Sequence, residues 1–223
     1  MKVHVVVADQ SHGKYSTTIC DMINAAALTR GTGIAKREPE YIRRKLEEGS
    51  AVIALHEQEV VGFCYIESWE DKKYVANSGL IVHPDFRNTG LAKAIKREIF
   101  QLSRQKYPEA KLFGITTSLA VMKINTELGY RPVTFSELTQ DETFWKGCQS
   151  CPNYDVLTRT ERKMCLCTGM VCDLKALSEK PAEPQNGKAW EKLQDFLKRR
   201  KERIQTAAQK FPKLYYLTKN DQS

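Results

Sequence analysis

Residues 79–93 combine residue types that could bind a phosphate. Their sequence, GLIVHPDFRNTGLAK, ends a β-branched run at a proline, places Arg87 and Gly90 in a short turn and then begins an apolar-periodic helix. The first amides of a helix lack intrahelical partners and lie at the positive end of its dipole. A glycine turn there can cradle phosphate oxygens, and Arg87 and Lys93 would add positive charge. The alternative is a plain strand-turn-helix with a surface arginine, because short glycine motifs match often.

Two motifs resemble the GNAT N-acetyltransferase superfamily. Arg87-x-x-Gly90-x-Ala92 is similar to its acyl-coenzyme A motif, Q/R-x-x-G-x-G/A, and Leu128-Gly129-Tyr130 is similar to the Leu-Gly-Phe/Tyr that ends a later helix of the family. The order of expected elements from residue 2 to residue 135 is also similar, so the resemblance covers about three-quarters of the chain. Residues 144–167 also resemble the end region of a bacterial subgroup associated with arginine biosynthesis.

The resemblance implies acetyl-CoA or another acyl-CoA as cosubstrate. Backbone groups of Leu80, Ile81 and Val82 would pair with the pantetheine arm. The pyrophosphate would be held by the turn and the start of the helix, which are Arg87, Asn88, Thr89, Gly90, Leu91, Ala92 and Lys93. The thioester would then lie near residues 77–79, where Gly79 suits a bulge. A backbone N–H of that bulge would stabilise the oxyanion, an interaction worth ~3–4 kcal/mol in related acyl transfers.

Two positions depart from the family pattern. Many members carry a tyrosine general acid four residues before the glycine of Leu-Gly-Phe/Tyr, whereas this chain has Asn125 there. Asn125 does not protonate a thiolate as tyrosine does, but it can hydrogen-bond the sulfur or the pantetheine. The family's frequent acidic base is also missing, since the strand before the motif reads Ala76-Asn77-Ser78. Glu67 is then the nearest candidate base, acting through water, and a solvated Glu67 on an edge is the alternative.

A site that lacks the family's usual acid and base favours an α-amine as acceptor. A free α-amino group has a pKa of ~7.7–8.0, whereas a lysine amine has one near ~10.4 and is harder to acylate at neutral pH. In the family, the loop that corresponds to residues 29–37 borders the acceptor pocket. Its cations Arg30, Lys36 and Arg37 would suit a carboxylate-bearing substrate, with a solvated basic loop as the alternative.

The seven cysteines are expected to be reduced thiols, because the chain shows no export signal. Cys148-x-x-Cys151 has zinc-knuckle spacing, and Cys165 and Cys167 would share one face of a strand. The order of these cysteines along the chain is irregular, and no histidine lies nearby. We therefore favour the interpretation that they are buried core thiols, and we assign no metal. A structural zinc site formed by the four thiolates of Cys148, Cys151, Cys165 and Cys167, and a regulatory thiol pair, stay open.

The periodicity predicts the elements that must position these residues. Strands are expected at residues 2–8, 51–56, 60–69, 75–82, 111–117, 130–135 and 163–172, and helices at 13–30, 39–49, 91–106, 120–128 and 188–209. Apolar residues Leu91, Ile95, Ile99 and Leu102 mark the buried face of the helix that follows the phosphate turn. This mixture predicts an α/β (α+β) fold with a mixed, mostly antiparallel sheet flanked by helices, similar to the GNAT fold.

Composition is ordinary for a globular protein, with 41% hydrophobic and 28% charged residues among 223. No apolar run of about 18 residues predicts a membrane span, and a cytoplasmic protein is expected. The net charge of +8 is concentrated at the end, where residues 178–223 hold eleven lysines and arginines against six acids. That basic helix would suit nucleic acid or an acidic partner, but we favour packing of Trp190, Leu193 and Leu197 on the domain.

We therefore expect an acyltransferase domain at residues 1–173, a linker at 174–187 and a basic helical extension at 188–223. The expected reaction transfers an acetyl or succinyl group from acyl-CoA to a small-molecule amine, with glutamate as the first guess. Acetylation of protein N-termini or lysines, and a non-catalytic acyl-CoA-binding module, are the alternatives. A homodimer stays open, and neither a membrane nor nucleic acid is an expected partner.

Overall fold

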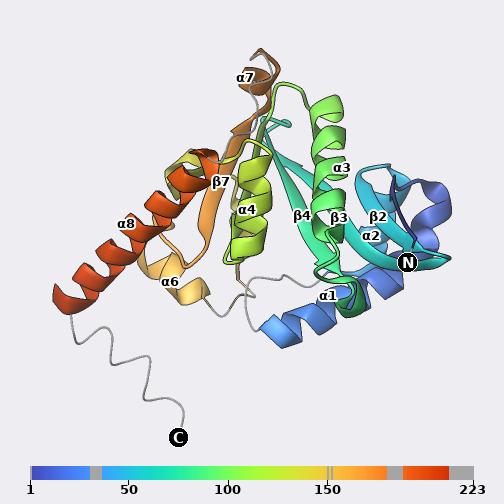
Figure 1. Ribbon diagram of the computed structural model, residues 1–223, viewed down its shortest axis with the longest axis horizontal. Helices are drawn as coiled ribbons and strands as arrows, with labels where there is room; N and C mark the ends of the chain where they lie inside the picture. Colours follow the sequence, from blue (N-terminus) through green and yellow to red (C-terminus); the bar gives the residue numbers. More distant parts are fainter. Residues whose placement is uncertain (1, 31–36, 150, 152, 180–187, 211–223) are drawn as a thin grey trace, which may run out of the picture. The chain divides into compact units, whose positions relative to one another are not determined.

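Seven strands form one sheet in the order β1-β2-β3-β4-β5-β7-β6 (Figure 1). They are β1 (Val3–Val7), β2 (Ala51–His56), β3 (Glu59–Trp69), β4 (Tyr74–Val82), β5 (Lys111–Thr116), β6 (Arg131–Val133) and β7 (Thr168–Asp173). Only β4 and β5 pair in parallel, and all other neighbours are antiparallel. This computed structural model describes residues 2–30, 37–149, 151, 153–179 and 188–210, within two compact units, Met1–Glu183 and Pro184–Ser223. The expected fold class is confirmed.

The helices of the first unit are short except for two. They are η1 (Gln10–Tyr15), α1 (Ser16–Arg30), α2 (Pro39–Glu47), η2 (Pro84–Phe86), α3 (Leu91–Lys106), α4 (Leu119–Glu127), η3 (Phe135–Glu137), α5 (Glu142–Lys146), α6 (Tyr154–Arg159) and α7 (Leu174–Glu179). In Figure 1, β4 is visible between α3 and α4, which lie in front of the sheet. The second unit holds one described helix, α8 (Lys188–Lys210). None of the described helices is long and apolar enough to cross a membrane.

The sheet divides where β4 leaves β5. Their pairing joins Tyr74–Ala76 to Lys111–Phe113 and ends there, although β4 continues to Val82. The register between β3 and β4 also shifts at this level, between Phe63 and Tyr65, which marks a bulge. Gly79 lies in it with φ +66°, and a Cβ there would lie 2.8 Å from a ring carbon of Tyr65. Glycine is therefore required at the bulge, as the sequence predicts.

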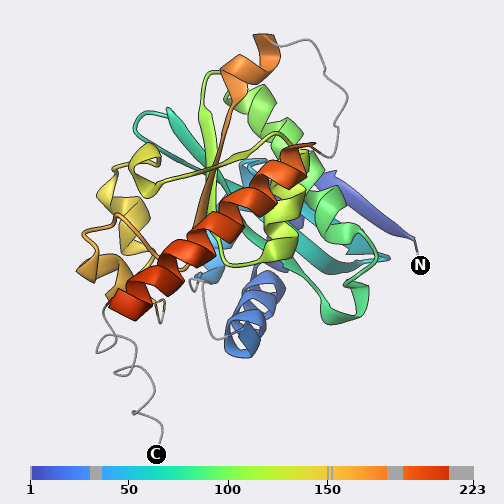
Figure 2. The same cartoon turned by 60° about the vertical axis from the view of Figure 1, so that its left-hand side comes forward.

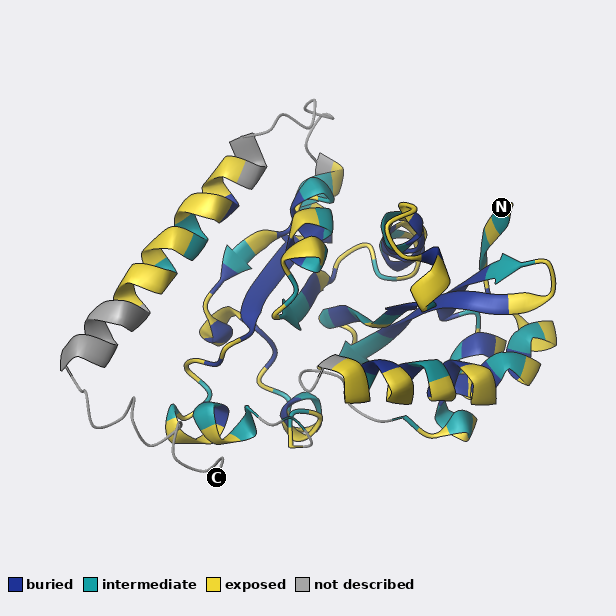
Figure 3. Ribbon diagram, turned by 60° about the horizontal axis from the view of Figure 1, so that its bottom comes forward, coloured by how far each residue is buried: buried dark blue, intermediate teal, exposed yellow. Residues whose placement is uncertain are grey.

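Each half of the sheet has its own core (Figure 3). Ile19, Ile42, Ile53 and Phe63 belong to the cluster that β2 and β3 form with α1 and α2. A second cluster beyond β5 contains Phe113, Phe135, Leu138, Trp145 and Leu157. The predicted apolar face of α3 is buried at all four positions. Because two cores pack separately, the divergence of β4 from β5 leaves space between them.

The connection between β6 and β7 differs from the sequence prediction. Strand β7 begins at Thr168, so residues 163–167, which we expected to belong to this strand, lie outside it. The helices α5 and α6, which the sequence did not predict, precede it. Helix α7 occupies residues that we expected to form a linker. These helices have five or six residues, too few for a helical period to stand out, and α5 depends on a local cap from Asp141 to the amide of Thr143.

Candidate active site

A cavity of about 830 Å³ opens where β4 and β5 diverge. One wall is β4, represented by Asn77, Ser78, Gly79, Leu80 and Ile81, and the facing wall is the end of β5 with the start of α4. A third wall comes from residues 135–167. The fourth carries Arg37, Tyr41, Tyr65, Glu67 and Trp69. The cavity thus brings the predicted thioester region together with Glu67 and Arg37.

Glu67 is the acidic side chain that lines this cavity, and 24% of its side chain is exposed. Burial raises the pKa of Glu67 to about 7, against the opposing effect of the Arg37 guanidinium. Lys45 Nζ on α2 donates to Glu67 Oε1 over 3.0 Å, and this ion pair also favours the carboxylate. Burial in turn lowers the pKa of Lys45. A carboxyl that titrates near neutral pH can accept a proton from an attacking amine.

Arg37 supplies positive charge to the same cavity. Its Nε donates to the hydroxyl of Tyr65 over 2.7 Å, and its guanidinium carbon lies 5.9 Å from the ring centroids of Tyr41 and Tyr65. These contacts fix the plane of a group that binds carboxylates through two parallel N–H bonds. Of the other predicted acceptor residues, Lys36 lies outside the described residues, and Arg30 ends α1 without a described side chain.

Strand β4 presents part of its predicted pantetheine surface. Leu80 and Ile81 line the cavity, whereas Val82 is buried and does not. Past Ala76, the described sheet pairs β4 only with β3, so the edge of β4 that faces β5 keeps its backbone groups available. Cys64 Sγ donates to the carbonyl of Ser78 over 3.3 Å from the β3 side. An extended substrate arm could pair with the remaining edge.

The predicted pyrophosphate turn is exposed at the start of α3. Gly90 is the N-cap with φ +87° and no capping side chain, and nothing lies within 4 Å of the place of a Cβ. Asn88 also has positive φ, and Thr89 Oγ1 donates to the Phe86 carbonyl over 2.7 Å. Arg87 Nε donates to the carbonyl of Val82 over 3.2 Å, which ties the turn to the end of β4. These four residues do not line the cavity.

Lys93 is placed differently from the prediction. Its amide donates to the Gly90 carbonyl over 3.0 Å, so this amide already has a hydrogen-bond partner. The amides of Leu91 and Ala92, at the start of the helix, are expected to lack one. Its ammonium pairs with Glu127 over 2.5 Å and thereby links α3 to α4. The amide and the ammonium of Lys93 thus both have partners in this structure, and the role of Lys93 in binding pyrophosphate stays a prediction.

Asn125 does not line the cavity. Only 2% of it is exposed, its Nδ2 donates to the sulfur of Met170 over 3.8 Å, and its Oδ1 has no hydrogen-bond partner. Its backbone carbonyl accepts from Leu128 and Tyr130 at the end of α4. The side chain thus packs against β7 in this conformation, and the contact with the sulfur or pantetheine that the resemblance implied stays a prediction.

Four cysteine thiols converge on the third wall of the cavity. They are Cys148, Cys151, Cys165 and Cys167. Burial, with repulsion from the neighbouring thiols, raises the pKa of Cys148 to about 11 and that of Cys167 to about 12, so both are protonated at neutral pH. Cys165 and Cys167 belong to the core cluster beyond β5. Within the described residues, no group of three or more His, Cys, Asp or Glu side chains is arranged to hold a metal ion.

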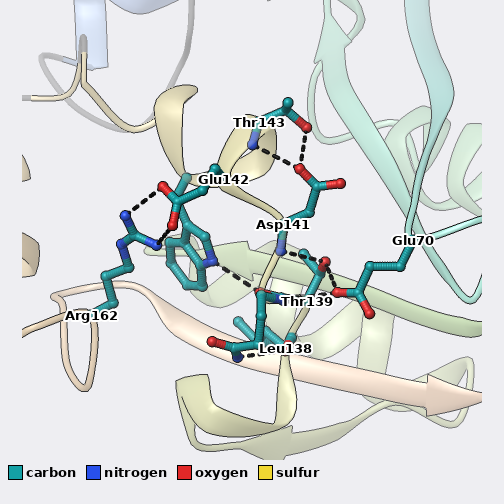
Figure 4. Close-up of polar contacts among 9 residues, drawn as sticks. Glu70, Leu138, Thr139, Asp141, Glu142, Thr143 and Arg162 are labelled. Atoms are coloured by element: carbon teal, nitrogen blue, oxygen red, sulfur yellow. Dashed lines mark hydrogen bonds and ion pairs between the residues drawn. The ribbon is translucent and has the colours of Figure 1, made fainter.

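The third wall is fixed by polar contacts with Glu70 and by others within its own segment (Figure 4). Glu70, just after β3, accepts from Thr139 Oγ1 over 2.5 Å and from the Gln140 amide over 2.9 Å. Arg162 and Glu142 form a bidentate pair over 2.6 and 2.7 Å. Trp145 Nε1 donates to the Thr139 carbonyl over 2.9 Å. These bonds hold the segment that brings Phe144 and Cys148 to the cavity.

Sequence reasoning missed the aromatic lining and two lysines. Trp69, Phe144 and Tyr154 line the cavity from segments far apart in the chain, and no local spacing joins them. The spacing of Lys45, one turn from Tyr41 on α2, is a signal in the sequence. It was missed because a charged side chain on a helix is normally assigned to the solvated face. Lys96 on α3 is buried on the sheet side of that helix.

Comparison with known proteins agrees with this geometry. Residues 20–123 match the family model of the acetyltransferase (GNAT) family. N-acetylglutamate synthase from Neisseria gonorrhoeae, complexed with coenzyme A and N-acetyl-glutamate, shares the fold with a TM-score of 0.56 and 18% identity over 78% of this chain. This chain spans 35% of the length of that synthase. No curated protein matches the sequence.

Two further solved structures have the same fold. Rv2747 from Mycobacterium tuberculosis, in complex with CoA and NLQ, aligns with a TM-score of 0.55 and 16% identity over 77% of this chain and 99% of its own. Diaminobutyrate acetyltransferase EctA from Paenibacillus lautus, in complex with its substrate and coenzyme A, aligns with a TM-score of 0.51 and 11% identity over 78% and 96%. The family model matches less than half of the chain, and the solved structures show that the chain shares their fold.

Proposed function

We propose that the chain transfers an acyl group from acyl-CoA to the α-amine of a small carboxylate-bearing substrate. The observation that carries this proposal is the cavity in which Glu67, Arg37 and the β4 bulge at Gly79 face one space. Glu67 serves as the base, Arg37 binds the carboxylate and the bulge stabilises the oxyanion. This arrangement suits direct attack by an amine, with no covalent enzyme intermediate.

The proposed step forms one carbon–nitrogen bond and breaks one carbon–sulfur bond. The neutral amine nitrogen forms a bond to the thioester carbonyl carbon, and negative charge develops on the carbonyl oxygen. The carbon–sulfur bond then breaks, its electron pair stays on sulfur, and Glu67 takes the proton that the nitrogen loses, directly or through one water. An amine with a pKa of ~7.7–8.0 is partly neutral at pH 7, so a base that titrates near pH 7 suffices.

Acyl-CoA fits the residues along the divergence of the sheet. Backbone groups of β4 from Leu80 onward would hold the pantetheine arm, because the strand edge toward β5 is unpaired past Ala76. The exposed amides beside Gly90, with Arg87 and Lys93, would hold the pyrophosphate, and the empty space at Gly90 leaves room for it. Bound there, acyl-CoA supplies the activated acyl carbon. Solved relatives of this fold were complexed with coenzyme A, which supports the assignment.

Glutamate is the acceptor that we test first. The solved N-acetylglutamate synthase supports this choice. The cavity also pairs a cation, Arg37, with a base, Glu67, as an α-amino acid requires for its carboxylate and its amine. The loop that contains Lys36 would add a second cation for the side-chain carboxylate. This assignment places the enzyme in arginine biosynthesis as a proposal, and the acyl group is acetyl or succinyl.

The test is thiol release from acetyl-CoA and succinyl-CoA with a panel of amines. The panel contains glutamate, other α-amino acids, glutamate with two methyl groups on nitrogen, a peptide with a free N-terminus and an N-terminally blocked peptide with one lysine. Release with α-amino acids but not with N,N-dimethylated glutamate or the lysine peptide is the expected result, because the dimethylated nitrogen has no proton to lose. Turnover of only the peptides would replace the acceptor assignment. CoA binding without turnover on any amine would favour a non-catalytic binding module.

A further inference from the structure

Lys96 is a charged residue enclosed in the core of the domain. It lies on α3, and only 3% of it is exposed. Its Nζ lies 3.5 Å from the backbone carbonyl of Asn77 and 5.6 Å from the ring centroid of Tyr130. The thiol of Cys64, on β3, is the ionisable group that acts on it electrostatically. Among the described residues, no carboxylate forms an ion pair with Lys96.

Such a position is unfavourable for folding. A buried ammonium without a carboxylate loses its hydration and gains little in return, and an apolar side chain of similar length often stabilises a protein at such a place. Burial accordingly lowers the pKa of Lys96. Places where a sequence breaks a folding rule without local compensation tend to be functional.

The contacts of Lys96 lead to the thioester region of β4. Asn77 is the first residue of β4 beyond its last pair with β5, and it lines the cavity. Its side chain is fixed on both sides, because Asn77 Nδ2 donates to Ser103 Oγ over 2.7 Å and Tyr130 Oη donates to Asn77 Oδ1 over 3.3 Å. Burial raises the pKa of Tyr130 well above its ordinary value, so its hydroxyl stays a donor. The ammonium of Lys96 thus lies against the backbone of a cavity-lining residue.

We propose that Lys96 is a positioning residue whose buried ammonium, held behind β4 by Asn77 and Tyr130, stabilises the thiolate that leaves during acyl transfer. This inference rests on the proposed function, because it requires the thioester to lie near residues 77–79. Lys96 gives up no proton in this step. The carbon–sulfur electron pair moves to sulfur, and the fixed positive charge lowers the energy of that anion in a region of low dielectric.

The assignment also explains how the chain can work without the family's tyrosine acid. Asn125 has no proton that it can transfer to a thiolate, and its side chain points to Met170. A leaving thiolate that is not protonated on the enzyme needs another source of stabilisation. Lys96 provides one from the opposite helix, α3.

The test compares binding of CoA with binding of desulfo-CoA, which lacks the sulfur. Calorimetry over a pH series that spans the ionisation of the free CoA thiol measures the thiolate contribution without turnover or acceptor. We expect wild type to bind CoA more tightly than desulfo-CoA by about tenfold, below the ~100-fold effect of a direct oxyanion donor. Lys96→Met loses this preference and keeps its affinity for desulfo-CoA, and Lys96→Arg retains part of the preference.

The matched control is Lys106→Met. Lys106 lies at the other end of α3, and its Nζ also donates to a backbone carbonyl, that of Glu48, over 3.2 Å. It should leave the preference unchanged. Thermal unfolding adds a second readout, because a merely structural role predicts that Lys96→Met is less stable, whereas our proposal predicts equal or greater stability with a kcat about tenfold lower and an unchanged KM for acyl-CoA.

The outcomes separate this inference from the proposed function. An unchanged preference for CoA in Lys96→Met overturns the role of Lys96 and leaves acyl transfer intact. Failure of wild type to bind CoA overturns both, and it is recognised because desulfo-CoA then fails as well. Should Lys96→Met not fold, Lys96→Gln removes the charge, keeps a hydrogen-bond donor and gives the same comparison.

Discussion

Lys45 and Glu67 form an ion pair over 3.0 Å beside the cavity that Glu67 lines, although they lie on different elements, α2 and β3. Both side chains are largely buried, with 16% and 24% exposed. Burial raises the pKa of Glu67 to about 7, and the Lys45 ammonium beside it favours the carboxylate form. We propose that Glu67 is the base of the proposed enzyme and that Lys45 holds it in place.

Glu67→Gln should lower kcat by about 100-fold or more, because general-base catalysis contributes ~10²–10⁴-fold. The amide cannot accept the amine proton but keeps the shape of the side chain. Steady-state kinetics with the amine found in the panel measures the effect. Glu59→Gln, at the exposed start of the same strand, is the control and should retain full activity. Equal activity of wild type and Glu67→Gln would remove Glu67 from the mechanism.

The pKa of Glu67 predicts a pH dependence of stability. The folded-state pKa, about 7, lies above the ordinary value of 4.5, so the unfolded chain loses this proton at lower pH than the folded chain does. The folded state is therefore penalised increasingly as pH rises from 4.5 through 7. Denaturant unfolding should show Glu67→Gln to be more stable than wild type at pH 8 and nearly equal to it at pH 4.5. A difference that stays constant across this range would contradict the raised pKa.

The same group predicts how activity varies with pH. Because the base works when deprotonated, kcat/KM should rise with pH up to about 7 and then level until another group titrates. Lys45→Met removes the ammonium that favours the carboxylate and should move this rise to higher pH. A pH–rate profile for both proteins makes the comparison. A profile that is identical in the two proteins would show that Lys45 does not tune Glu67.

Arg37→Met should raise KM for the acceptor by about 10- to 100-fold, since hydrogen bonds to charged groups contribute ~1.5–3 kcal/mol. KM for acyl-CoA should stay unchanged, because Arg37 lies on the Glu67 side of the cavity. Arg43→Met, an exposed arginine of α2, serves as control. An amine that lacks a carboxylate should show no effect of Arg37→Met, and a similar loss with that amine would exclude carboxylate binding.

Arg87→Glu should weaken binding of CoA by about tenfold or more, because it places a carboxylate beside the proposed pyrophosphate site. Binding of a CoA fragment without the pyrophosphate should not change. Isothermal calorimetry compares this variant with Arg97→Glu, an exposed arginine further along α3. If both variants bind CoA as wild type does, the turn at Gly90 is not the nucleotide site.

The sequence predicts most of this site where its signals are local. The bulge at Gly79, the turn at Gly90 and the buried face of α3 follow from glycine, proline and helical spacing within about 25 residues of chain. Glu67 was found because it lies on the strand that pairs with the motif strand. Lys96 was not, because periodicity treats a lysine beside a buried face as solvated. Its partners Asn77 and Tyr130 are distant in sequence, and only the tertiary fold brings them together.

The anchoring of the third wall to Glu70 has a consequence for the proposed enzyme. The segment between β6 and β7 lines one side of the cavity and is tied to the end of β3 by the two hydrogen bonds that Thr139 and Gln140 donate to Glu70, whereas the proposed nucleotide end depends on β4 and α3. Under the proposed function, exchange of that segment between related chains would alter which amine is accepted while the donor stays the same. The choice of amine and the choice of donor would then be set by separate stretches of one polypeptide.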